Sequence, residues 1–189
     1  NMVSNRLYLN KGNFQFEDIT APAGLESEGS WSTGVSVADV NGDGLMDIYV
    51  CKSGPPDGIR RANELFINNG NLTFSEKAAD FGMAFKGLSV HASFFDYDKD
   101  GDLDLFVGGR ISPLRYPESP DSYLLQNDGK GNFTDTTPAD LKKTGMVTSA
   151  LWTDFDNDSW TDLVIAGEWM PITFFKNSGG KLIRFQPEN

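Results

Sequence analysis

The feature that most constrains this fold is a nine-residue acidic loop that occurs three times. The central copy is DYDKDGDLD, from Asp96 to Asp104, in which acidic side chains stand at every second position around a glycine. Near-copies stand upstream, as DVNGDGLMD from Asp39 to Asp47, and downstream, as DFDNDSWTD from Asp154 to Asp162. The two intervals are almost equal. Three copies at one period predict a repeat architecture, since each copy marks the same place in a repeated unit.

A second marker alternates with the acidic loops. It is an apolar run followed by an Asn-x-Gly turn, and it occurs as LYLNKGNFQF, LFINNGNLTF, LLQNDGKGNF and FFKNSGGKL. Asn and Gly tolerate positive φ, so each marker predicts a β-hairpin. We call the Asn residues of these markers the turn asparagines: Asn10, Asn68, Asn127 and Asn177.

Strand-like runs also flank each acidic loop. The runs that leave the loops, at 48–50, 105–107 and 163–165, are continuously apolar, which is typical of strands covered on both faces. Each unit is therefore predicted to contain, in order, a strand, the acidic loop, a strand, a connection, a strand, the Asn-Gly turn and a strand. This order predicts an all-β fold, a β-propeller built from four-stranded antiparallel blades.

The whole chain, 1–189, is predicted to be a single propeller segment of about three and a half blades. A two-stranded half blade occupies 1–30, and full blades occupy 31–84, 89–141 and 147–186. Closed propellers have about 4 to 8 blades, so this segment would leave open sheet edges that invite pairing with another strand. We expect the remaining blades to come from a longer chain or from a second copy.

The acidic loops are predicted calcium sites. Oxygens from loop positions 1, 3, 5 and 9 converge, and the main-chain carbonyl of position 7 can complete a shell that suits Ca²⁺ better than Zn²⁺. We expect two or three ions, because Ser159 replaces the glycine that positive φ favours in the third loop. The predicted ligands are Asp39, Asn41, Asp43, Leu45 and Asp47; Asp96, Asp98, Asp100, Asp102 and Asp104; and Asp154, Asp156, Asp158, Trp160 and Asp162.

Three alternatives compete with a calcium site of this type. Mg²⁺ is a weaker candidate because it keeps its waters, and a hairpin turn without an ion must tolerate repulsion among its carboxylates. An EF-hand needs a bidentate Glu at position 12 and flanking helices. Position 12 is instead Val50, Val107 or Ile165, between strand-like flanks, so the sequence excludes EF-hands.

These loops and hairpins resemble the FG-GAP and VCBS repeats, the calcium-binding propeller units of integrin α chains. The phrases NRLYLNKGNFQFEDIT and NELFINNG are most similar to the family of extracellular proteins related to cartilage acidic protein, which carry an ASPIC/UnbV region beyond their repeats. That region is not evident here. After the second strand of each blade the integrin Gly-Ala-Pro is also missing, so the resemblance implies the metal loops but not integrin-type ligand recognition.

Long connections on the opposite face of the ring are the candidate ligand-binding regions, since loops on a rigid scaffold often carry function. The candidate ligand residues, through Arg pairing and aromatic stacking, are Arg110, Arg115, Tyr116 and Trp169. The alternative is solvated arginines and a Trp that packs under a loop. The other tryptophans, Trp31, Trp152 and Trp160, are predicted to pack in the core or between blades.

Charge and composition narrow the function. With 16 basic and 27 acidic residues the net charge is −11, which opposes binding to nucleic acid or anionic lipid. No apolar run approaches the ~20 residues needed to span a bilayer. We expect an extracellular, periplasmic or cell-surface module that binds a protein or glycan partner, as in adhesion. A lyase-like enzyme acting on polysaccharides, using Tyr116 with Arg110 or Arg115, is less expected, and a purely structural spacer is the third possibility.

Overall fold

The structure is a computed structural model that describes residues 4–27, 29, 31–54 and 61–186. Its strands form three four-stranded antiparallel sheets and one two-stranded sheet. The first blade contains β3 (Trp31–Ala38), β4 (Asp47–Ser53), β5 (Glu64–Asn68) and β6 (Phe74–Glu76). The second contains β7 (Leu88–Phe95), β8 (Asp104–Ile111), β9 (Tyr123–Asn127) and β10 (Phe133–Asp135). The third contains β11 (Met146–Thr153), β12 (Asp162–Glu168), β13 (Thr173–Asn177) and β14 (Leu182–Phe185).

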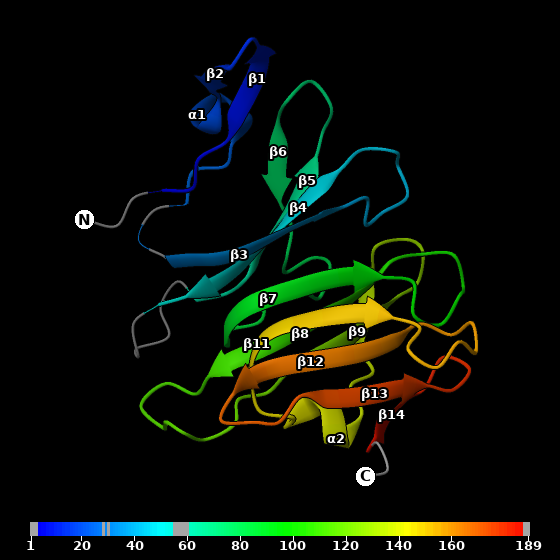
Figure 1. The fold of residues 1–189 in the computed structure, drawn as a ribbon. Coiled ribbons are helices and arrows are strands. Elements are labelled where there is room, and N and C mark those ends of the chain that lie inside the picture. Colours follow the sequence, from blue (N-terminus) through cyan, green and yellow to red (C-terminus); the bar gives the residue numbers. More distant parts are fainter. Residues whose placement is uncertain (1–3, 28, 30, 55–60, 187–189) are drawn as a thin grey trace.

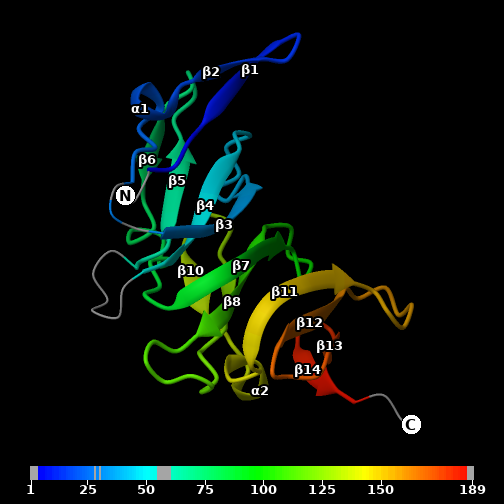
Figure 2. The same ribbon diagram turned by 60° about the vertical axis from the view of Figure 1, so that its left-hand side comes forward.

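The three sheets stand side by side as propeller blades, which confirms the predicted fold (Figure 1). The two-stranded sheet, β1 (Tyr8–Gly12) with β2 (Gln15–Asp18), lies at one end of the row, and the blades turn progressively along it (Figure 2). The two described helices, α1 (Thr20–Ala23) and α2 (Ala139–Lys142), are single turns. No described helix has the length and apolar character needed to cross a bilayer.

Each acidic loop joins the first two strands of a blade, and each Asn-Gly turn joins the last two. Because neighbouring strands are antiparallel, both connections fall at the same edge of the blade. β8 runs from Asp104 at this edge to Ile111 at the opposite edge, a span of roughly 25 Å at about 3.3 Å per residue. The long connections that hold the candidate ligand residues therefore lie on the far face from the acidic loops.

Side chains between neighbouring blades form separate hydrophobic clusters, one at each contact between blades. Trp152 of the third blade stacks on Phe95 of the second, with 5.4 Å between ring centroids, and its indole N–H donates to Ser93 Oγ at 3.1 Å. The predicted packing of Trp152 between blades is therefore confirmed. Close approach of the blades also explains Gly34, where an added Cβ would lie 2.4 Å from the carbonyl oxygen of Val90 in the next blade.

The prediction that Trp31 is a packing residue is wrong, because this side chain is 52% exposed. The N-terminal segment covers only part of the first blade, through a cluster in which Ile19 and Leu25, which follow β2, pack with Val50 and Phe66 of the blade. The strands that would complete a four-stranded sheet beside β1 are missing at this position in the described structure, so the inner part of β3 lacks a cover. The effect is clear at matched positions: Val35 is 67% exposed, whereas Ala92, its counterpart in the second blade, is 8% exposed.

Candidate metal centre

The ninth residue of each acidic loop is a buried aspartate that closes the loop. We call Asp47, Asp104 and Asp162 the closing aspartates; all three are buried. One carboxylate oxygen of Asp104 accepts the amide N–H of Tyr97 at 3.2 Å, and the other accepts that of Asn127 at 2.9 Å. Asp47 and Asp162 make the same two kinds of bond in their own blades. Each closing aspartate thus ties the second residue of its loop to the turn asparagine.

The turn asparagines extend this network from blade to blade. The side-chain amide of Asn127 donates to the Val40 carbonyl in the first acidic loop at 3.0 Å, and that of Asn177 donates to the Tyr97 carbonyl in the second at 2.7 Å. Both asparagines are buried, and each also bonds to a carbonyl of its own loop, Leu103 or Thr161. From the sequence these residues were predicted only to form turns. Their recurrence at a similar place after each loop was the signal for this second role.

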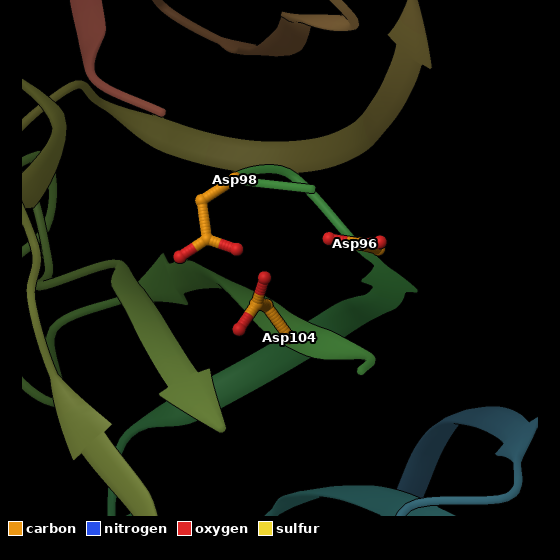
Figure 3. Close-up of side chains that lie close together, drawn as sticks. All are labelled: Asp96, Asp98 and Asp104. Carbon is orange, nitrogen blue, oxygen red and sulfur yellow. The ribbon is translucent and has the colours of Figure 1, made fainter. Parts of the chain in front are cut away.

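The second loop gathers its carboxylates around a common space. Ligand atoms of Asp96, Asp98 and Asp104 lie within 4.8 Å of one another, and Figure 3 shows their side chains turned toward that space. Among the described residues, Asp96, Asp98 and Asp102 each have one buried carboxylate oxygen, Oδ1, without a hydrogen-bond partner. Buried polar oxygens normally find a partner, so these orphans fit a hard, oxygen-seeking cation.

Electrostatics in the second loop point the same way. Burial raises the pKa of Asp104 to about 7, because removing a carboxylate from water disfavours its charged form. Burial, and then the neighbouring charge of Asp100, raises the pKa of Asp98 and of Asp102. A divalent cation would reverse these shifts, since it stabilises the ionised carboxylates that surround it.

The first loop satisfies more of its own groups. Asp39 accepts the amide N–H groups of Gly42, Asp43 and Gly44, at 2.8 to 3.1 Å. The Asn41 side-chain amide donates to Asp43 Oδ2 at 3.0 Å, so the neutral residue at position 3 compensates one carboxylate. This loop offers the oxygen types that calcium prefers, but its carboxylates do not gather as closely as those of the second and third loops.

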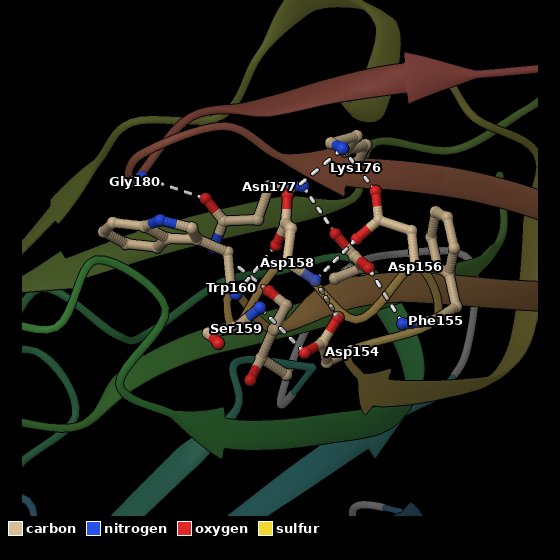
Figure 4. Close-up of polar contacts among 11 residues, drawn as sticks. Asp154, Phe155, Asp156, Asp158, Ser159, Trp160, Lys176, Asn177 and Gly180 are labelled. Atoms are coloured by element: carbon tan, nitrogen blue, oxygen red, sulfur yellow. Dashed lines mark hydrogen bonds and ion pairs between the residues drawn. The ribbon is translucent and has the colours of Figure 1, made fainter.

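The third loop contains a cluster of Asp154, Asp156 and Asp162, whose ligand atoms lie within 4.8 Å of one another. Figure 4 shows the Lys176 ammonium group above this loop, paired with Asp156 and, at 3.1 Å, with Asp158 Oδ2. The amide N–H of Trp160, and then Lys176, lowers the pKa of Asp158. Ser159 has φ +73°, as its place in the glycine position predicted, and this conformation costs a non-glycine residue about 1 kcal/mol.

The residues at loop position 7, predicted to offer main-chain carbonyls, differ in their side chains. Leu45 is exposed, and the half-buried Asp102 adds a carboxylate with one buried oxygen near Gly129 of the adjacent turn. The Trp160 ring lies under the Lys99 ammonium group of the second blade, 4.4 Å from it. Trp160 therefore takes part in a contact between blades, as expected.

On the opposite face, the structure brings the candidate ligand residues together. Arg110 pairs with Glu168 across the second and third blades, and Arg115 pairs with Glu118 at 3.2 Å. The rings of Tyr116 and Trp169 meet edge to face with centroids 6.5 Å apart. Trp169 is 82% exposed and Tyr116 is 53% exposed, so two loops far apart in sequence present one aromatic surface.

Antiparallel blades that each carry an acidic loop at the same edge define a class of repeat protein. The sequence profile of the FG-GAP-like repeat matches residues 1–50, 57–107 and 116–185. The chain therefore belongs to the FG-GAP-like repeat family.

The chain is also similar to cartilage acidic protein 1 from three vertebrates. The human protein is 29% identical over 185 residues, the mouse protein 30% over 185 residues, and the Xenopus tropicalis protein 30% over 190 residues. Each match covers 93% of this chain and 27% of the relative, so the chain spans about a quarter of the length of these proteins.

The bonds between blades lead to a stability prediction. Asn177→Ala should lower the free energy of unfolding by about 2 to 3 kcal/mol, because it leaves the carbonyls of Tyr97 and Thr161 without their donor. Asn68→Ala is the matched control, since the side-chain amide of Asn68 donates to Met46 in its own blade at 3.1 Å. Both variants also remove a bond from a glycine amide of the turn, that of Gly70 to Asn68 or that of Gly180 to Asn177. Urea unfolding of the two variants measures the difference, and equal losses would contradict the role assigned to Asn177.

Proposed function

We propose that this chain is an extracellular calcium-binding propeller module that binds a protein or glycan partner. The observation that carries the calcium part is the set of buried, unpartnered oxygens on Asp96, Asp98 and Asp102. Membership of the FG-GAP-like repeat family supports it, as does the repetition of the same donor pattern in three loops. The pattern consists of oxygen donors alone, which suits Ca²⁺ and disfavours softer metals.

The proposed ligands are the side chains at loop positions 1, 3, 5 and 9 and the carbonyl at position 7. The closing aspartates already accept two amide bonds each, but a carboxylate has about four acceptor sites and can still bind an ion. The second loop is the strongest candidate, and two or three ions in all remain the proposal. Binding at such sites is typically weak, with Kd of about 10⁻⁴ to 10⁻³ M in extracellular modules, which supports a location outside the cell, in the periplasm or at the cell surface.

The calcium proposal predicts a shift in thermal stability. Calcium at ten times its Kd should stabilise the fold by about 1.4 kcal/mol per site, raising the melting midpoint relative to the same protein in chelator. Asp98→Asn should reduce this shift, because it removes a charged ligand from the second loop. Asp80→Asn is the control, since Asp80 is an exposed carboxylate paired with Lys77 outside the loops. Differential scanning calorimetry measures both, and identical midpoints in calcium and chelator would refute calcium binding.

The proposed partner site is the aromatic surface of Tyr116 and Trp169. Edge-to-face rings present an apolar area for stacking, and Arg110 and Glu168 beside them supply hydrogen-bond donors and acceptors. Each of the two arginines is already paired with a glutamate in the described structure. This arrangement favours recognition of a neutral or zwitterionic surface over neutralisation of a substrate carboxylate, and so favours a binding module over a lyase.

Substitution of the aromatic pair tests this assignment. Trp169→Ala should weaken binding to a responsive polysaccharide or matrix protein by about two- to tenfold, because it removes a stacking surface worth about 0.5 to 1.5 kcal/mol. Leu114→Ala is the control on the facing loop, at an apolar side chain that is 87% exposed. Binding is measured by biolayer interferometry against a polysaccharide and matrix-protein panel, with lyase activity assayed in parallel. Cleavage abolished by Tyr116→Phe would favour the enzyme, and no response to any probe would favour the spacer.

We also propose that the whole chain is one propeller segment whose ends are covered by further blades, from a longer chain or a second copy. One end face is the apolar surface of Val35 and Val37, which lines a cleft together with other residues of β3 and β4, the segment 5–7 that precedes β1, and Leu25. The other end face carries Leu151, which is exposed and occupies the register position at which Ser93 faces the next blade. Exposed apolar end faces, and an edge of β1 that no described strand pairs with, favour association with another strand pair.

Isolated in solution, this chain should therefore associate with itself as its concentration rises. Val35→Glu should shift it toward the monomer, because a carboxylate on this face would have to be buried in the contact. Light scattering coupled to size-exclusion chromatography measures the mass, and Leu45→Glu, at an exposed apolar residue of an acidic loop, is the control. A wild-type chain that is monomeric at every concentration would contradict open end faces.

A further inference from the structure

The second and third acidic loops are each contacted by a residue that lies outside the loop, and this residue differs in charge between the two blades. The residue directly before each turn asparagine, which we call the pre-turn residue, is Ile67, Gln126 or Lys176. In the second blade the Gln126 side-chain amide donates to Asp98. In the third blade Lys176 occupies the corresponding place and pairs with Asp156 and Asp158 (Figure 4). The pre-turn residue thus reaches the third position of the loop, a predicted ligand, in both blades.

We propose that the pre-turn residue sets the cation affinity of each loop, and that Lys176 is a built-in counter-ion that holds the third loop at low affinity. The inference rests on the calcium function proposed above and assigns to that function a tuning residue. Lys176 lies on β13, so it belongs to a different hairpin of the blade from the loop that it contacts.

The physical reason for the low cation affinity of the third loop is that Lys176 already compensates the charge of its carboxylates. An ammonium group already paired with Asp156 and Asp158 must be displaced, or must remain near the incoming ion at an electrostatic cost. An ammonium group about 4 Å from a divalent cation repels it even in a dielectric like water, and partial exposure and salt reduce this repulsion. The second loop has no such obstacle, because Gln126 is neutral and donates one hydrogen bond.

The oxygen atoms of the two loops show the same contrast. Three carboxylate oxygens of the second loop are buried without a partner, whereas none of the third loop, whose nine residues are all described, is in that state. The other lysine near these two loops, Lys99, belongs to the second loop, but its side chain extends toward the third. Its ammonium group donates to the Ser159 carbonyl at 2.6 Å and covers Trp160. Both lysines therefore place their ammonium groups at the third loop, and no described ion pair compensates the carboxylates of the second loop.

A reciprocal exchange of the two pre-turn residues tests the proposal. Lys176→Gln should raise the affinity of the third loop for Ca²⁺ by about tenfold, and Gln126→Lys should lower that of the second loop by a similar factor. Tb³⁺, another hard oxygen-seeking cation, reports binding through luminescence sensitised by tryptophan, and Ca²⁺ competition then gives the calcium affinity. Because the Trp160 ring also lies against Lys99 of the second loop, emission is assigned to the third loop where it disappears in Trp160→Phe but persists in Asp98→Asn.

Two further variants separate the charge of Lys176 from its shape and from the overall charge. Lys176→Arg keeps the cation and should bind calcium as the wild type does. Lys181→Gln removes one positive charge from the same hairpin at an exposed side chain, and it too should leave the affinity of the third loop unchanged. In chelator, Lys176→Gln should melt below the wild type, because Asp156 and Asp158 lose their counter-ion, and calcium should restore the midpoint.

The possible outcomes separate the tuning role of Lys176 from calcium binding itself. A tenfold gain for Lys176→Gln with no change for Lys176→Arg and Lys181→Gln supports the proposal. Loops that bind calcium with the same affinity before and after the exchange overturn it while leaving the calcium function intact. The absence of Ca²⁺ and Tb³⁺ binding at every loop would overturn both. If Lys176→Gln fails to fold, the predicted loss of affinity in Gln126→Lys still decides the question at the second loop.

Discussion

The structure depends on the bond between a buried carboxylate and the backbone amides at one edge of each blade. A buried carboxylate is costly to remove from water, and each closing aspartate offsets that cost with two amide hydrogen bonds. These bonds join the acidic loop to the Asn-Gly turn, and the turn asparagine then reaches the loop of the preceding blade. The path runs from Asp47 through Val40 and Asn127 to Asp104, and onward through Tyr97 and Asn177 to Asp162. A single hydrogen-bonded chain therefore links all three acidic loops.

This network gives the closing aspartates two roles. They position the loop through their amide bonds, and in the second and third loops they also lie with the aspartates at positions 1 and 3 around the space in which an ion would sit. Loops held in one frame then differ mainly in the side chain that compensates their charge: the Asn41 amide in the first, the Gln126 amide in the second, and the Lys176 ammonium group in the third. The frame is common to the three blades, and local substitutions distinguish one loop from the next.

Local signals made most of the fold predictable. Apolar runs, Asn-Gly turns and the near-constant spacing of the acidic loops specify strands and their order before any contact is known. The sequence patterns did not predict contacts between residues that are distant in the chain. Lys176 and Asp158 lie in different hairpins, and no propensity says which carboxylate an exposed lysine will meet. Trp31 was misplaced for the opposite reason: its apolar character predicted burial, but burial depends on a neighbouring blade of which β1 and β2 supply only one pair of strands.

The same strands connect the proposed metal edge to the proposed partner face, so a loss of partner binding need not mean that the metal contacts the partner. β8 begins at the closing aspartate Asp104 and leads to Arg110, and β12 begins at Asp162 and leads to Glu168. The Arg110–Glu168 pair exists only while the second and third blades keep their packing, which the Asn177 bond to Tyr97 helps to hold. Removing an ion that steadies the loops would thus loosen the opposite face without any contact between ion and partner. Calcium-dependent partner binding in this chain is therefore expected to follow blade packing rather than bridging by the metal.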